Sequence, residues 1–187
     1  MNEREEKLLR EIRSWVSSIY SNADHLLATE KWLLKLEPKA SLSLRVAALT
    51  HDVERAFEND RNPPKSENLV KWDDVVYAKW HGKRSAGFVE QKLREGMNKN
   101  SLIKEIRELI EFHEFGGNNH KDLIKDSDSL SFLEINVPIF ISWIPARRTK
   151  EDVKEKIDYM FGRISSSKAK KLAKPLYEKA VGDLEKV

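Results

Sequence analysis

The sequence predicts an all-α protein that folds as a single domain. Glycine and proline are scarce, with 7 and 6 among 187 residues. Long stretches carry apolar residues at spacings of three and four, the period of an amphipathic helix. No segment alternates convincingly between apolar and polar residues, as a half-buried strand would. A chain of this length can bury a core without disulfides or a structural metal.

The apolar period predicts eight helices, over residues 3–20, 22–36, 40–57, 73–95, 101–114, 121–136 and 149–162, and from 166 onward. Pro38 follows the second helix. Segment 59–66, rich in Asn, Asp and Pro, predicts a surface loop that could lie over a pocket as a lid. Gly96 is the expected C-cap of the fourth helix.

Ser101 fits the N-cap of the fifth helix, and Gly116 with Gly117 provides its stop. Thr149 and Asp152 resemble a capping box, with Asp in place of Glu, which would open the seventh helix. Pro175 should kink or break the last helix, because proline removes a backbone donor.

Composition excludes several classes of function. The chain has no cysteine, which rules out disulfides, thiolate catalysis and Cys-based zinc sites, so any metal must be held by His and carboxylates. The 34 basic and 31 acidic residues leave a net charge of +3, so nucleic-acid binding is unlikely. The most apolar stretch, 137–144, is too short to span a membrane. The charged N-terminus lacks the apolar core of a signal peptide, so we expect a cytoplasmic protein.

Four of the five histidines fall on apolar or small-residue faces of the predicted helices, namely His25, His51, His81 and His113. A single inward histidine is more often a hydrogen-bonded core residue than a metal ligand. Burying four imidazoles in one small core is costly unless they share a partner, and a divalent cation supplies one to all of them.

Acidic residues complete this set. Asp52 directly follows His51, and Asp128 shares a helical face with Ile124 and Phe132. Helical phase does not separate Asp128 from Asp126, which lies on an apolar face of its own. The alternative role for Asp126 is helix capping or hydrogen bonding to a metal ligand.

The order His25, His51–Asp52 and Asp128 resembles the H…HD…D signature of the HD superfamily of metal-dependent phosphohydrolases. The segment RVAALTHDV at 45–53 is similar to the helix that carries the second ligand, and DSDSL at 126–130 is similar to the last-ligand segment. In that segment the second aspartate binds metal, which favours Asp128. A looser resemblance, in HEFGG at 113–117, points to an uncharacterised microbial branch.

The resemblance implies an HD-type helical bundle, with the metal-site core over about 22–136 and C-terminal helices over about 149–187. It also implies a divalent metal, one or two ions per chain. In members with two metals, two further histidines lie between the HD pair and the last aspartate, and His81 and His113 fit that order. Asp52 would then bridge the ions. In the competing interpretation one metal is bound, and His81 and His113 bind phosphate or donate a proton to the leaving oxygen. The ligands admit Mn, Fe, Co, Ni, Mg or Zn.

The function implied is hydrolysis of a phosphate ester or anhydride, in a nucleotide or another small phosphorylated metabolite, by a metal-activated water. The catalytic candidates are Asp52, Glu54 and Arg55. We expect Glu54 to orient water and Arg55 to bind phosphate; the alternative is that both are ordinary surface charges. Lys83 and Arg84 are further candidates for substrate binding, with the same alternative. The alternative function is a non-catalytic metal- or nucleotide-binding sensor. The oligomeric state stays open.

Overall fold

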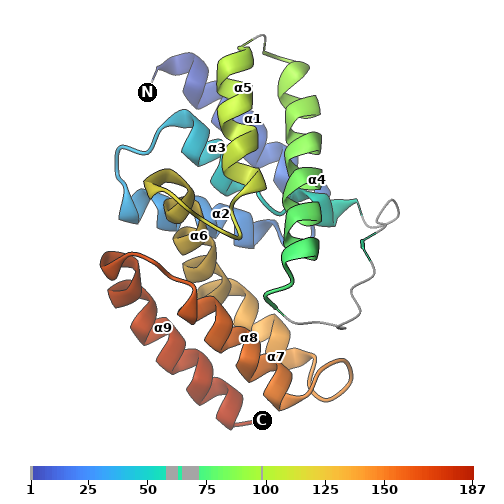
Figure 1. The fold of residues 1–187 in the computed structure, drawn as a ribbon, viewed down its shortest axis with the longest axis vertical. Helices are drawn as coiled ribbons and strands as arrows, with labels where there is room; N and C mark the ends of the chain where they lie inside the picture. Colours follow the sequence, from blue (N-terminus) through green and yellow to red (C-terminus); the bar gives the residue numbers. More distant parts are fainter. Residues whose placement is uncertain (1, 58–62, 65–71, 98) are drawn as a thin grey trace.

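The computed structural model describes residues 2–57, 63–64, 72–97 and 99–187, and every regular element within these ranges is helical (Figure 1). The all-α prediction is therefore confirmed. In chain order the elements are α1 (Glu3–Ile19), α2 (Ala23–Leu36), α3 (Leu42–Thr50), the 3₁₀-helix η1 (Val53–Ala56), α4 (Val75–Arg94), α5 (Asn100–Glu111), α6 (Asn119–Ser131), the π-helical turn η3 (Phe132–Asn136), α7 (Val137–Ser142), α8 (Lys150–Gly162) and α9 (Ser167–Glu185).

Two clusters of buried apolar side chains hold these helices together. The first joins α1 to α6, and the second joins η3, α7, α8 and α9. Helices α2 and α6 take part in both, because α2 directs Leu33 into the first cluster and Trp32 into the second. In Figure 1 the C-terminal helices lie below α2 and α6, and the other helices lie above them. Helices α2 and α6 therefore connect the two clusters.

The third predicted helix is broken in the structure. It was expected to run over 40–57, but α3 ends at Thr50, residues His51 and Asp52 form a turn, and η1 follows. The hydroxyl of Thr50 donates to the carbonyl of Val46 at 2.7 Å, a side-chain bond that commonly bends helices. This break changes the direction in which Asp52 leaves the helix.

Two of the predicted helix start and stop signals are present in the structure, and the predicted break at Pro175 is not. The capping box of Thr149 and Asp152 is present, and Gly116 and Gly117 have positive φ angles of 69° and 118°. Pro175 does not break the last helix, since α9 runs continuously to Glu185.

Two further caps lie elsewhere than predicted. The N-cap of α5 is Lys99 instead of Ser101, and α4 ends with Glu95 as its C-cap, one residue before Gly96. The predicted lid at 59–66 lies outside the described residues apart from Pro63 and Pro64. No described helix combines the length and apolarity that crossing a bilayer requires.

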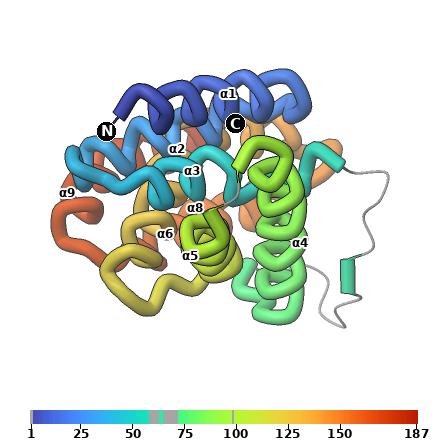
Figure 2. The backbone as a smooth tube through the Cα atoms, turned by 90° about the horizontal axis from the view of Figure 1, so that it is seen from above, coloured from blue at the N-terminus to red at the C-terminus, as the bar shows by residue number. Residues whose placement is uncertain are grey.

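Helices α4 and α5 lie side by side in both views (Figure 2) and approach closely at Gly82. A Cβ at Gly82 would lie 2.7 Å from the backbone oxygen of Glu111, so this crossing admits only glycine. We predict that Gly82→Ala destabilises the fold by about 1–3 kcal/mol through overpacking. Gly87→Ala on the same helix meets open space and should instead stabilise by about 0.5–1 kcal/mol. Denaturant unfolding of the two variants measures this difference, and equal stability would contradict the tight crossing.

Candidate metal centre

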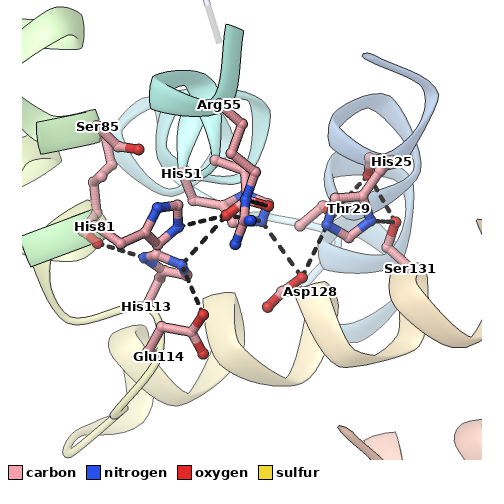
Figure 3. Close-up of polar contacts among 12 residues, drawn as sticks. His25, Thr29, His51, Arg55, His81, Ser85, His113, Glu114, Asp128 and Ser131 are labelled. Carbon is pink, nitrogen blue, oxygen red and sulfur yellow. Dashed lines mark hydrogen bonds and ion pairs between the residues drawn. The ribbon is translucent and has the colours of Figure 1, made fainter. Parts of the chain in front are cut away.

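The side chains of the four inward histidines converge on one cluster beside α2 and α6 (Figure 3). His25 lies on α2, His51 in the turn after α3, His81 on α4, and His113 in the turn after α5. Their exposed fractions are at most 1%, which confirms that all four face inward. Neighbouring imidazole rings have centroid separations of 5.0–5.4 Å along the series His25, His51, His113, His81.

One half of the cluster is formed by His25, His51 and Asp52, whose potential ligand atoms lie within 4.8 Å of one another. Asp128 on α6 joins this half through its Oδ1 atom. That oxygen lies 3.0 Å from the Nε2 atom of His25 and 3.4 Å from the Nε2 atom of His51. Both imidazoles therefore direct their Nε2 atoms toward the carboxylate of Asp128.

The other half consists of Asp52, His81 and His113 under the same 4.8 Å criterion. The Oδ1 atom of Asp52 lies 2.7 Å from the Nε2 atom of His81 and 3.7 Å from that of His113. Glu114 adds a carboxylate oxygen 3.7 Å from the Nε2 atom of His113. Asp52 thus belongs to both halves, which is the position predicted for a bridging ligand.

The hydrogen bonds of His51 and His113 determine which ring nitrogen carries a proton. A backbone carbonyl only accepts, so the Nδ1–H of His51 donates to Ala48 at 3.1 Å. In the same way the Nδ1–H of His113 donates to Ile110 at 2.7 Å. In each of these rings, when it is neutral, the Nε2 atom then carries a lone pair and no proton. Both Nε2 atoms are buried, have no hydrogen-bond partner among the described residues, and face Asp52.

The same assignment holds for His25. The hydroxyl of Ser131 donates to the carbonyl of His25 at 2.7 Å, so its oxygen accepts from the Nδ1–H of that ring at 2.8 Å. His81 lies between two carboxylates, with its Nδ1 atom 2.8 Å from Glu54 and its Nε2 atom 2.7 Å from Asp52, so either nitrogen can donate. Burial lowers the pKa of His81, but the two carboxylates outweigh burial and raise it. In the neutral rings of His25, His51 and His113, the Nε2 lone pair therefore faces a carboxylate oxygen. This arrangement is repulsive unless protons or cations lie between them, and a divalent metal fits both partners.

The charges of the cluster shift its pKa values in opposite directions. Burial lowers the pKa of His51, but the carboxylates of Asp52 and Asp128 outweigh burial and raise it to about 8. Burial dominates at His113, whose pKa falls to about 4. Without metal, His51 therefore binds a proton at neutral pH while His113 stays uncharged.

The two aspartates that helical phase could not separate have different roles. Asp128 faces His25 and His51, as described above. Asp126 accepts hydrogen bonds from the backbone N–H groups of Ser165 at 2.7 Å and Ser166 at 2.9 Å. It thereby fixes the segment that opens α9. Only Asp128 is placed to bind metal with the histidines.

The other predicted site residues lie at different distances from the cluster. Arg55 donates to Asp52 at 2.9 Å and has a side chain 34% exposed. Glu54 is fully buried behind His81, and the Nε atom of Arg84 lies 3.5 Å from its second oxygen. Lys83 is exposed on α4, two residues from the buried His81, and no described contact connects it to the cluster. Its role in substrate binding stays a prediction.

The sequence did not point to three charged residues at the cluster. The guanidinium of Arg163, just after α8, forms ion pairs with both Asp128 and Glu114, and its Nε donates to Ser129 at 2.9 Å. Lys156 lies on α8, and its charge interacts with those of Glu114 and Asp128. Glu114 could have been suspected because it directly follows His113. The two cations had no such signal, since lysines and arginines are frequent along α8 and α9.

Comparison with protein-family models, with curated proteins and with solved structures found no match for this chain. The relation to the HD superfamily therefore stays a prediction that depends on the residues quoted for it.

Proposed function

We propose that the chain is a metal-dependent phosphohydrolase that cleaves a phosphate ester or anhydride. The observation that supports this most is the set of four buried Nε2 atoms directed at Asp52 and Asp128, two of which, in His51 and His113, have no hydrogen-bond partner among the described residues. Two three-residue groups that share a carboxylate suit two divalent ions. His25, His51, Asp52 and Asp128 would hold one ion, and Asp52, His81 and His113 the other.

The donor set fits such a metal. It is made of imidazole nitrogens and carboxylate oxygens without sulfur, which suits Mn, Fe, Co, Ni and Zn, and Mg less well because of its preference for oxygen. A bound divalent ion would lower the pKa of a water molecule and polarise a phosphoryl oxygen.

The residues around the metal ligands have separate roles in the proposed reaction. Arg55, partly exposed beside Asp52, is placed to bind an oxygen of the phosphate that is cleaved. Glu54 is fully buried and bonded to His81, so it orients that imidazole and does not reach substrate. Arg163 holds Asp128 and Glu114 in position from α8. During hydrolysis a water oxygen bonds to phosphorus, the bond to the leaving oxygen breaks, and the leaving group ends with a proton.

The test is a panel of phosphate monoesters, phosphodiesters, nucleotides and pyrophosphate, assayed after chelation and after reconstitution with each divalent ion. We predict turnover only with metal, and a loss of at least about 100-fold in His51→Ala, because a direct ligand should matter more than its hydrogen-bond partners do. His120→Ala is the matched control, since His120 is the exposed fifth histidine. Circular dichroism checks that both variants fold.

Tight metal binding without turnover on any member of the panel would overturn the proposal. It would favour the alternative of a metal- or nucleotide-binding sensor, which uses the same ligands.

A further inference from the structure

Helix α8 presents a row of side chains toward α6 and the metal centre. Lys156, Tyr159 and Arg163 follow one another at spacings of three and four, so they share one face. Arg163 at the end of this row is neutralised by Asp128 and Glu114. Within the described part of the chain, Lys156 at the other end has no carboxylate at ion-pair distance.

Aromatic rings surround the ammonium of Lys156 in place of a counter-ion. It lies 4.9 Å from the ring centroid of Trp72, 5.3 Å from that of Phe132 and 5.2 Å from that of Tyr159. Such faces attract a cation but offer no oxygen acceptor, so the three N–H donors of Lys156 stay available to an anion. Burial lowers the pKa of Lys156 to about 8, so it keeps a large part of its charge near neutral pH.

A second cation shares one of these rings. The guanidinium of Arg148 lies 5.1 Å from the centroid of Trp72, and it too has no carboxylate partner among the described residues. Two positive groups on one indole repel each other, and each has donors to spare. An anion that bound both would remove the repulsion and satisfy these donors.

This cationic pair lies close to the metal centre. The charge of Lys156 interacts with those of Glu114, Asp128 and Arg55. Phe132, which Lys156 contacts, follows Asp128 by four residues, or about 6 Å along the helix. An anionic group at Lys156 would thus be distinct from a phosphate bound by metal ions at Asp52 and Asp128.

We propose that Lys156 and Arg148, presented on Trp72, bind a second anionic group of the substrate, next to the phosphate that is cleaved. The substrate class is a compound with two separate anionic groups, such as a bisphosphate or a nucleoside diphosphate. This inference rests on the proposed function, but the anion site itself needs no metal. It also assigns the C-terminal helices a part in substrate binding.

The first experiment titrates inorganic phosphate into the metal-free protein at low salt and measures binding by calorimetry. We expect one site per chain, weakened at least tenfold in Lys156→Met, which retains an apolar stem of similar length. Lys154→Met is the matched control, because it removes the same charge from α8 where the lysine is paired with Asp158. Lys156→Arg should retain binding. Equal phosphate affinity in Lys156→Met and the wild-type protein would overturn the proposal.

The second experiment compares KM values of the metal-loaded enzyme for a nucleoside monophosphate and a nucleoside diphosphate. Lys156→Met and Arg148→Gln should raise KM at least tenfold for the diphosphate only, with wild-type metal content. Hydrolysis with unchanged KM in both variants refutes the anion site and leaves the proposed function standing. Phosphate binding that depends on Lys156, without hydrolysis of any phosphoester, refutes the proposed function and supports the anion site.

Discussion

Replacing Asp52 by asparagine should remove nearly all metal from the protein, whereas replacing His113 by alanine should remove at most one of two ions. Asp52 belongs to both three-residue groups, while His113 belongs to one. The amide of asparagine has no negative charge to balance a divalent ion or the imidazole lone pairs around it. We expect a loss of affinity beyond the roughly 10- to 100-fold that removing a partner of a ligand costs.

Elemental analysis of dialysed protein and metal titration measure this effect. A second pair of variants compares Asp128→Asn with Asp126→Asn as its matched control. Asp126 lies on the same helix as Asp128 but accepts hydrogen bonds from the backbone of Ser165 and Ser166. Asp126→Asn should keep its metal and lose only stability, whereas Asp128→Asn should lose metal. Full occupancy in Asp52→Asn would contradict the shared ligand, and metal loss in Asp126→Asn would contradict the assignment of the two aspartates.

Divalent metal should raise the melting temperature of the protein, and the rise should be larger at pH 8.5 than at pH 6. Metal at 100 times its Kd stabilises the folded state by about 2.7 kcal/mol, which in a protein of this size corresponds to roughly 5–11 °C. Differential scanning calorimetry with metal and with chelator measures the shift. His51→Ala should abolish most of it.

The pH dependence follows from the raised pKa of His51, about 8 in the folded protein against about 6.5 in an unfolded chain. Without metal, the proton on His51 contributes stability below pH 6.5, and this contribution is lost as the pH rises through 8. Metal competes with that proton and with the proton of His81, whose pKa the carboxylates of Asp52 and Glu54 raise, so its affinity should fall at least about tenfold per pH unit below 8. His113, with a pKa of about 4, does not compete. A metal effect that is equal or larger at pH 6 would contradict His51 as a ligand.

Local patterns were enough to predict the helices and the inward direction of the histidines. A helical face is defined by neighbours three and four residues away, so His25 and His81 could be placed inside from their own segments. The same reasoning placed His51 inside correctly, but it missed the break of the helix at His51 and Asp52. The break coincides with a side-chain hydrogen bond from Thr50 to the carbonyl of Val46, which the hydrophobic period does not register.

Residues that act across the fold could not be predicted in this way. Asp126 and Asp128 both fall on apolar faces of α6, and only the position of α2 and of the segment before α9 separates their roles. Arg163 is about 35 residues from Asp128 in the chain, and its ion pair exists because α8 packs back along α6.

The sequence by itself determined the fold class, the buried histidines and the absence of any cysteine ligand, because these follow from composition and short-range periodicity. The tertiary structure alone shows that Asp52 lies within reach of both groups, that the Nε2 atoms of four histidines meet around Asp52 and Asp128, and that α8 brings Lys156 and Arg163 to the cluster. These properties depend on distances between helices far apart in the chain, which helix packing sets and local sequence does not encode.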